Sequence, residues 1–337
     1  MHLNRECRYP DLSNLFARTD LTVEARNLQT AVQKEVADQL LMLQGGIPSV
    51  EPGPFCTEPR DCPFLHRCWP KLPEHHISSL YRIGQKSVGL EAQGIHTIFD
   101  LPQDYPLSAV ASRQRISVQE NKVVVEQGLK SALEKWKAPI AFLDFETIAP
   151  AIPVWNGCRP YDPVPVQFSC HTLDLDGSLK HLDWIADGPF DPRENLVAHV
   201  AEAVKGATVI LAWNASFERR CLNDVKACLP HLAEQIEAIV ERIDDLLPVV
   251  RNHVYHPHFD GSFSIKSVLP ALLPDLGYDG MAIADGQSAS DTLEAMLLRG
   301  NNIPIDTKNE LLENLRAYCR LDTYAMVALL AKLREIA

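Results

Sequence analysis

The chain has 337 residues, 46% of them hydrophobic, and a formal net charge of −12 at pH 7. This length and apolar content suffice for two or three domains with buried cores. The negative charge excludes a protein that coats nucleic acid by bulk attraction, because such binding grows with the number of phosphates that Lys and Arg neutralise. A nucleic-acid enzyme stays open, since an acidic metal site adds to the negative total.

No apolar run reaches about 18 residues, and the opening MHLNRECRYP has no apolar signal core. We therefore expect a cytoplasmic protein without membrane contact. The nine cysteines are odd in number and unevenly spread. They fit reduced thiols and a metal site better than a disulfide framework.

Residues 1–72 begin like a loop and continue into 22–43, whose apolar spacing predicts an amphipathic helix. The Pro-rich stretch that follows carries Cys56, Cys62 and Cys68, with five residues between each. A loop lets three thiols converge, as a soft metal or a cluster requires. Three interpretations stay open: unligated thiols in a small core, zinc with His66 or His75 as the fourth ligand, and an iron-sulfur cluster.

This cysteine spacing resembles the C-terminal triplet of RecB-like and CRISPR-associated iron-sulfur nucleases. In those families a fourth cysteine lies far upstream, before the nuclease motifs, whereas here Cys7 is the only other early thiol. No Asp followed by a Glu-x-Lys pair precedes Cys56. The resemblance implies that residues 1–72 are the remnant of a RecB-like nuclease domain without its active site.

Residues 73–137 are helical in pattern, and we interpret them as a linker domain. Within them, 80–102 resembles a helix-hairpin-helix, in which a Gly-containing turn at Ile83 and Gly84 presents backbone N–H groups to a phosphate. Lys86 would add a positive charge near that phosphate. A DNA contact and a plain packing hairpin both stay open. Residues 118–137 are expected to form a linker helix.

From 138 to 337 the pattern changes to strands and helices. Strands are expected at 140–147, 165–173 and 177–185, then a helix at 191–206, a buried strand at 208–213, and mostly helices beyond. Asp191 and Glu194 suggest a capping box at the start of the 191–206 helix. This order predicts an α/β fold: an RNase H-like mixed sheet flanked by helices, preceded by a mostly helical N-terminal region.

Acidic residues of this domain stand near the end of a strand, just after another strand and on a late helix. Asp144 and Glu146 stand one residue apart near the end of a strand, so they share a face. Like charges this close are tolerated when a cation lies between them. Glu218 follows the 208–213 strand. Tyr318 and Asp322 are four apart on a helix and share a face.

Together these residues resemble the Tyr variant of the DEDD-type 3'-5' exonuclease domain. That superfamily carries Asp-x-Glu, then Asn-x-x-Phe-Asp, then Tyr-x-x-x-Asp. The matching residues stand in the same order: Asp144 and Glu146, Asn214 and Phe217, Tyr318 and Asp322. The second motif departs from the pattern, because Glu218 stands where the family has Asp. The whole chain is also similar to an uncharacterised bacterial family of unknown function (2779).

The resemblance implies two-metal hydrolysis of nucleic-acid phosphodiesters from a single-stranded 3' end, in a setting such as DNA repair. Asp144 would bridge two Mg²⁺ or Mn²⁺ ions, Glu146 and Asp322 would hold the ion that activates water, and Glu218 the other. Tyr318 would orient the attacking water. The residues expected to meet nucleic acid are Asn214, Phe217, Arg219, Arg220 and Lys266.

Two other functions stay open. One is a catalytically degenerate nuclease fold that binds nucleic acid or a protein. The other is a metalloenzyme for a non-nucleic phosphoester. His256 and His258 are interpreted either as a pair of metal ligands or as ordinary histidines of a surface loop. The five later cysteines, Cys158, Cys170, Cys221, Cys228 and Cys319, are expected to be small buried apolar residues.

Overall fold

The computed structural model describes residues 1–50, 53–56, 58, 60, 62–68, 71–300 and 303–337, without the side chains of Pro54 and His66. The chain divides into two compact units. The smaller comprises residues 1–3 and 16–74, and the larger residues 4–15 and 75–337. No helix in the described ranges is long and apolar enough to cross a membrane.

The smaller unit is built from short elements and one long helix. Strands β1 (His2–Leu3) and β2 (Phe16–Ala17) pair antiparallel. Helix α1 (Thr22–Leu43) has the predicted bounds, but none of its residues is buried. The other elements are η1 (Pro54–Cys56) and α2 (Leu65–Cys68).

The larger unit contains a five-stranded mixed sheet, in the order β6-β5-β4-β7-β8. Its strands are β4 (Ile140–Ile148), β5 (Val164–Leu173), β6 (Leu179–Ile185), β7 (Val209–Ala212) and β8 (Ile243–Asp245). The pairs β6-β5 and β5-β4 are antiparallel, whereas β4-β7 and β7-β8 are parallel. This confirms the predicted RNase H-like α/β class. The short strand β8 was not predicted.

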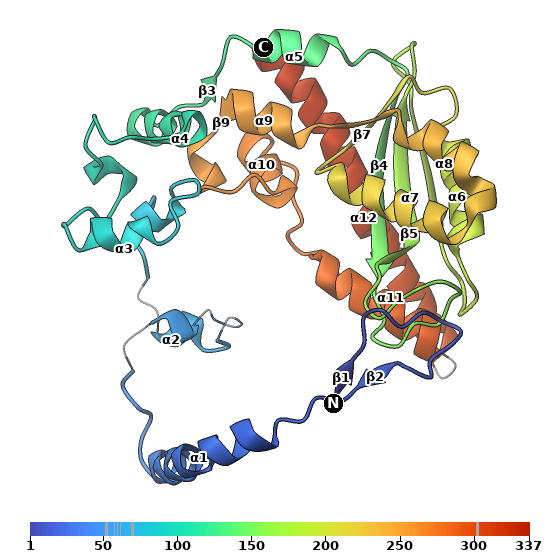
Figure 1. Cartoon of the computed structure of the whole chain (residues 1–337). Helices are drawn as coiled ribbons and strands as arrows, with labels where there is room; N and C mark the ends of the chain where they lie inside the picture. Colours follow the sequence, from blue (N-terminus) through green and yellow to red (C-terminus); the bar gives the residue numbers. More distant parts are fainter. Residues whose placement is uncertain (51–52, 57, 59, 61, 69–70, 301–302) are drawn as a thin grey trace. The chain divides into compact units, whose positions relative to one another are not determined.

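The larger unit contains helices α3 to α12, some of which cover the two faces of this sheet. They are α3 (Lys86–Glu91), α4 (Ala109–Glu120), α5 (Leu129–Glu134), α6 (Arg193–Ala203), α7 (Ser216–Cys228), α8 (Ala233–Val240), α9 (Leu247–His253), α10 (Ile265–Leu272), α11 (Gly286–Arg299) and α12 (Ile305–Ile336). Figure 1 shows α6, α7 and α8 on one face and α12 crossing the other. A second, two-stranded sheet pairs β3 (Val124–Val125) with β9 (Val254–Tyr255).

Strand β4 separates two hydrophobic cores because its side chains alternate between faces. Ala141, Leu143 and Phe145 pack with α6, α7 and α8. Ile140 and Phe142 pack on the other face, with α12. Asp144 and Glu146 follow Phe142 at every second position, so their side chains point to the same face of the strand as Phe142. The alternation therefore turns both acids toward the face that α12 covers.

Residues 75–120 form a third, smaller core that includes Ile77, Leu90, Ile98 and Val118. The expected helix-hairpin-helix is incomplete, because its first helix is only the 3-10 turn η2 (Ile77–Ser79) before α3. A second turn, η3 (Ile98–Asp100), follows α3.

Two local predictions were wrong. The linker helix expected at 118–137 is interrupted: α4 ends at Glu120, Asn121 adopts a left-handed φ of 47°, and β3 and α5 follow. The strand β3 forms there because β9, distant in sequence, supplies its hydrogen bonds. The capping box is also absent, since the Glu194 carboxylate contacts His231 Nε2 at 2.6 Å instead.

Candidate active site

One cavity of about 360 Å³ collects the acids that the sequence singled out. Its lining residues include Asp144, Glu146, Glu218 and Asp322, and we call it the acidic cavity. Glu218, Glu146 and Asp322 are 2%, 7% and 8% exposed, and Asp144 is half-buried. The four carboxylates come from three elements, β4, α7 and α12.

Strand β4 positions the first two acids. Asp144 lies opposite Ser169 of β5, and Glu146 opposite Gln167. The register shifts between Glu146 and Thr147, so regular pairing with β5 is interrupted just beyond the second acid. The two carboxylates therefore stand on one face of the strand, next to an irregularity of the kind often found beside active sites.

The third acid follows the tight turn from β7 into α7. Asn214 adopts a φ of 69°, a conformation that Asn tolerates better than most residues. Asp245, at the end of β8, accepts hydrogen bonds from the Asn214 and Ala215 amides, both at 3.1 Å. This fixes the start of α7. Glu218, in its first turn, points inward, and its Oε2 is buried without a hydrogen-bond partner among the described residues.

Helix α12 brings Tyr318 and Asp322 to the cavity. The Tyr278 hydroxyl donates to Asp322 Oδ1 at 2.5 Å. Lys266 Nζ donates to the Tyr318 hydroxyl at 3.0 Å and to the Ala284 carbonyl at 2.6 Å. The same ammonium lies 5.2 Å from the ring centroid of Tyr278 and 4.9 Å from that of Tyr318. The positively charged Lys266 ammonium is thereby held beside the acidic side chains of the cavity.

The cavity raises the pKa of every carboxylate in it. Burial raises the pKa of Glu146 to about 8, and the Asp322 charge adds to this rise while Lys266 opposes it. Burial also raises the pKa of Glu218 to about 8. The pKa of Asp144 is raised well above its usual range by burial and by the other three acids. Four ionised carboxylates are therefore unfavourable here without a compensating cation.

The pKa of Asp322 is raised less than the pKa values of Glu146 and Glu218. Burial raises its pKa to about 6, while the hydrogen bond from Tyr278 and the charge of Lys266 lower it. The pKa of Tyr318 is raised by burial and by the negative charge of Asp322, Glu146 and Asp144, so its hydroxyl keeps its proton.

Sequence reasoning missed three residues of this site. The Cys319 thiol donates to Asp144 Oδ2 at 3.7 Å, and one ligand atom each of Asp144, Glu146 and Cys319 lie within 4.8 Å of one another. Cys319 is buried, as expected, but it is also part of the site. Its position three residues before Asp322, on one helix face, was a signal. Tyr278 and Asp245 had no comparable signal.

The residues expected to meet nucleic acid separate into two groups. Asn214, Phe217 and Lys266 line the acidic cavity. Arg219 is not among its described lining residues, because its guanidinium donates to the Ile243 carbonyl and ties α7 to β8. The Arg220 guanidinium lies 5.3 Å from the Phe217 ring centroid.

The early cysteines lie around a different cavity, of about 360 Å³, which Cys56, Cys62 and Cys68 line together with Phe55 and Phe64. All three are free thiols: Cys56 is buried, Cys62 is half-buried and Cys68 is exposed. Within the described ranges their sulfurs do not form a group with ligand atoms within 4.8 Å of one another. The His66 side chain lies outside the described part, and a cluster or zinc stays a prediction.

His256 and His258 have a local structural role. His256 Nδ1 accepts the His258 amide at 3.1 Å, and their rings meet edge-on at 4.9 Å. Among the described residues they belong to no group with metal-binding geometry. Of the five later cysteines, four are buried and Cys228 is half-buried.

Comparisons with known proteins give a match over part of the chain and no activity. Residues 141–264, from β4 to the start of α10, match a domain of unknown function (DUF2779). The chain is 22% identical over 236 residues to the uncharacterized protein MG366 of Mycoplasma genitalium. The alignment covers 64% of this chain and 35% of that protein. The chain thus spans about a third of that relative. No solved structure matches.

Proposed function

We propose that the chain is a metal-dependent 3'-5' exonuclease that hydrolyses nucleic-acid phosphodiesters in the acidic cavity. The observation that carries this proposal is the convergence of four carboxylates from β4, α7 and α12 on one cavity. Burying so many acids together is costly for folding, and structures tolerate it mainly at functional sites. The order and spacing of these residues also resemble the DEDD-type exonuclease motifs.

The donor set fits Mg²⁺ or Mn²⁺. Both ions prefer carboxylate oxygens. Glu218 Oε2 is buried and finds no hydrogen-bond partner among the residues described, and a cation would satisfy it. Asp144, Glu146, Glu218 and Asp322 would hold the ions. When bound, such ions polarise the phosphoryl group and lower the pKa of a coordinated water.

The remaining polar residues would bind and orient the substrate. Lys266, held between the Tyr278 and Tyr318 rings, supplies a positive charge for a phosphate oxygen. The Tyr318 hydroxyl accepts a hydrogen bond from Lys266 and lies within hydrogen-bond reach of Asp322, where it would orient the attacking water. Tyr278 fixes the orientation of Asp322. Phe217 and Asn214, which line the cavity, would contact the terminal base.

The test is digestion of 5'-labelled single-stranded DNA and RNA with Mn²⁺, Mg²⁺ or EDTA. We expect a metal-dependent ladder that shortens from the 3' end. Asp144→Ala and Asp322→Asn should each lose more than about 100-fold in rate, since even outer-shell changes at metal sites cost 10–100-fold. Asp176→Asn is the matched control, because this exposed turn acid lies outside the cavity.

Two results would contradict the proposal. Intact strands held equally by the wild type and the variants, with or without metal, would indicate a binding module without hydrolysis. Turnover of a small phosphodiester but of no oligonucleotide would indicate a different substrate class. A ladder blocked by a 3'-terminal phosphorothioate would support the stated direction.

A further inference from the structure

A second cavity of the larger unit has the opposite charge. It measures about 560 Å³, and the loop at 80–83, Lys86, the stretch 105–111 and Arg251 line it. Its charged side chains are Arg82, Lys86 and Arg251, and no acid is among its described lining residues. We call it the cationic cavity. In a chain with a net charge of −12, three cations without a facing acid are a local exception.

These three cations have no anionic partner among the described residues, although the Arg82 guanidinium lies 5.3 Å from the Tyr81 ring centroid. Within the described ranges, none of the side chains of Arg82, Lys86 and Arg251 has a hydrogen bond or an ion pair. Other arginines of the unit are engaged: Arg113 with Glu126, Arg159 with Asp162, Arg193 with Asp191, Arg299 with Glu294 and Arg316 with Asp183. The unpaired cations therefore have their charge and N–H groups available for an anion.

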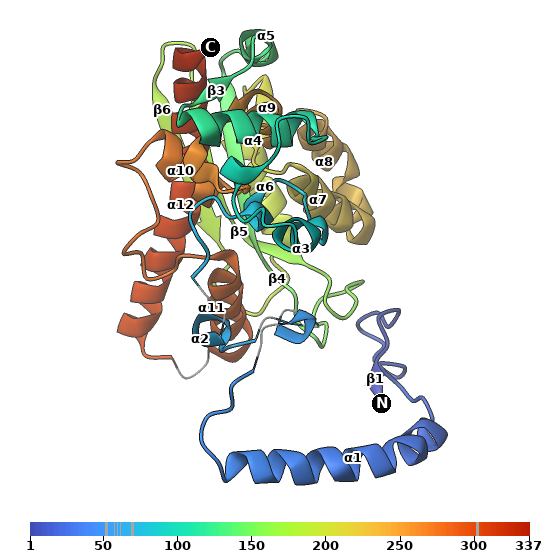
Figure 2. The same cartoon turned by 90° about the vertical axis from the view of Figure 1, so that its left-hand side faces the viewer.

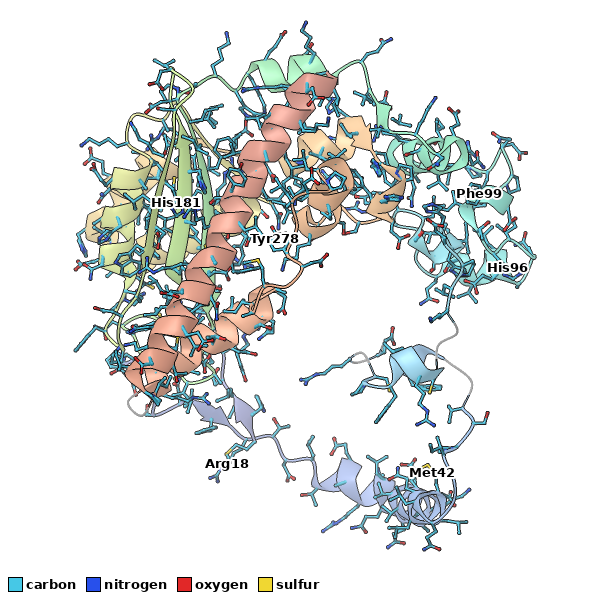
Figure 3. The ribbon with its side chains drawn as sticks, turned by 180° about the vertical axis from the view of Figure 1, so that it is seen from behind. Arg18, Met42, His96, Phe99, His181 and Tyr278 are labelled. Atoms are coloured by element: carbon cyan, nitrogen blue, oxygen red, sulfur yellow. The ribbon has the colours of Figure 1, made fainter. Side chains whose placement is uncertain are left out.

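Two buried side chains of α4 hold the walls of this cavity in place. Gln114, fully buried, accepts from the Tyr81 amide at 2.7 Å and donates to the Ser79 carbonyl at 2.9 Å. Arg113 donates to the carbonyl of Arg251 at 2.9 Å and to that of Asn252 at 2.5 Å. The loop and the end of α9 are thus both anchored to α4, and Figure 2 shows α4 beside α9. The site is preorganised, which lowers the entropic cost of binding.

A short chain of contacts joins the cationic cavity to the acidic one. Tyr81 lines the cationic cavity and meets Phe263 edge-on, with ring centroids 5.5 Å apart. The Phe263 carbonyl accepts a hydrogen bond of 3.1 Å from Trp213 Nε1, and Trp213 lines the acidic cavity. The walls of the two cavities are thus linked through Tyr81, Phe263 and Trp213.

We propose that the cationic cavity binds the backbone phosphates of a single-stranded nucleic acid, on the 5' side of the nucleotide in the acidic cavity. Arg82, Lys86 and Arg251 would meet the phosphates, and the rings of Tyr81 and Tyr105 would stack on bases. The identity of the ligand rests on the proposed function. An extended strand fits better than a free nucleotide, because the cations come from two separate segments, the stretch 82–86 and α9.

The test measures binding by fluorescence anisotropy of a labelled single strand in EDTA, so that hydrolysis plays no part. The variants are Arg82→Gln/Lys86→Gln and, separately, Arg251→Gln. Each phosphate contact contributes about −0.7 to the slope of log affinity against log salt, or about fivefold in affinity near 0.1 M salt. We expect about 25-fold weaker binding by the double variant, with a slope smaller by about 1.4. Arg251→Gln should lose about fivefold.

The matched control is Lys180→Gln/Lys205→Gln, which removes the same charge from exposed positions outside the cavity. Unchanged binding by this control, with unchanged melting temperatures of all variants, supports the inference. Equal weakening by the control and the cavity variants would overturn it, because bulk charge would then explain binding. Displacement of the strand by a nucleoside monophosphate at a concentration that fills the cavity would overturn it too.

Failure of this inference is distinguishable from failure of the proposed function. Cavity variants that bind strands as the wild type does, while the wild type digests them with Mn²⁺, would overturn the inference alone. Cavity variants that lose binding, while the wild type digests no strand, would support the inference and contradict the exonuclease.

Discussion

At the scale of single residues, the acidic cavity is defined by the free energy of burying carboxylates. Glu218 shows this most clearly, because its Oε2 is buried with no hydrogen-bond partner in the part of the chain that the structure describes, and its pKa is raised to about 8. Glu146 has a similar shift with the same main cause, burial. Lys266 offsets only part of the negative charge. The residues of this site therefore fold at a cost in stability that bound cations would reduce.

The first prediction concerns the pH dependence of stability without metal. Folded Glu146 and Glu218 keep a proton up to about pH 8, whereas the unfolded chain releases it near the ordinary value of 4.5. The folded state binds more protons between these values, so the free energy of unfolding falls as the pH rises from 4.5 to about 8. Differential scanning fluorimetry in EDTA should show a lower melting temperature at the upper end of this window.

Cations should reverse this loss. Mn²⁺ or Mg²⁺ should raise the melting temperature more at the upper end of the window than at the lower end, because the ligands are then ionised. Glu218→Gln, which removes one buried charge, should weaken both the pH dependence and the cation effect. An equal gain in melting temperature at both pH values would contradict a site built from these acids.

At the scale of elements, close backbone contacts hold the turns around the two cavities. Gly261, just after η5 (Pro257–Phe259), adopts a φ of 76°, and a Cβ there would lie 1.9 Å from the Ser79 carbonyl oxygen. Gln114 binds that same carbonyl. The turn before the cationic cavity therefore packs directly on the segment that leads into α10 and Lys266.

The second prediction follows from this contact. Gly261→Ala should lower the free energy of unfolding by about 3 kcal/mol or more, because backbone atoms must move apart and the φ is unfavourable for alanine. Gly280→Ala is the matched control: its φ is 81°, but nothing lies within 4 Å of the added Cβ. It should cost about 1 kcal/mol. Urea denaturation measures both, and equal costs would contradict the close packing of Gly261 on Ser79.

At the scale of the whole molecule, the chain separates into two units of very different packing. No residue of α1 is buried, although the helix is 22 residues long. The segment 4–15, in contrast, belongs to the larger unit. The Tyr9 amide donates to the Cys158 carbonyl at 3.0 Å, the Gly157 amide donates to the Tyr9 carbonyl at 2.9 Å, and Cys7 is fully buried.

The third prediction is the order of proteolysis. Trypsin should cut first in α1, at Arg26 or Lys34, because an exposed helix without tertiary packing opens readily. The peptide containing 4–15 should then stay with 75–337 during gel filtration, which mass spectrometry of the peak would establish. Initial cleavage within the sheet region, or early loss of that peptide, would contradict this division.

The sequence by itself determined the central strands, their order and the elements that carry the acids. Short apolar runs predict β4 and β5, and because side chains two apart in a strand point to the same face, Asp144 and Glu146 stand together. The turn residues 173–177, LDLDG, predict the hairpin between β5 and β6. Helical spacing alone puts Tyr318 and Asp322 on one face. These are local patterns, readable within a few residues.

Only the tertiary structure decided which side chains complete the site. Tyr278 is 44 residues from Asp322, so no local pattern relates these two, and the contact between Cys319 and Asp144 joins residues 175 positions apart. Asp245 acts from a strand too short to predict. The cationic cavity likewise joins Arg82 and Lys86 to Arg251. Such contacts depend on how elements pack across long stretches of chain, which spacing within one element does not contain.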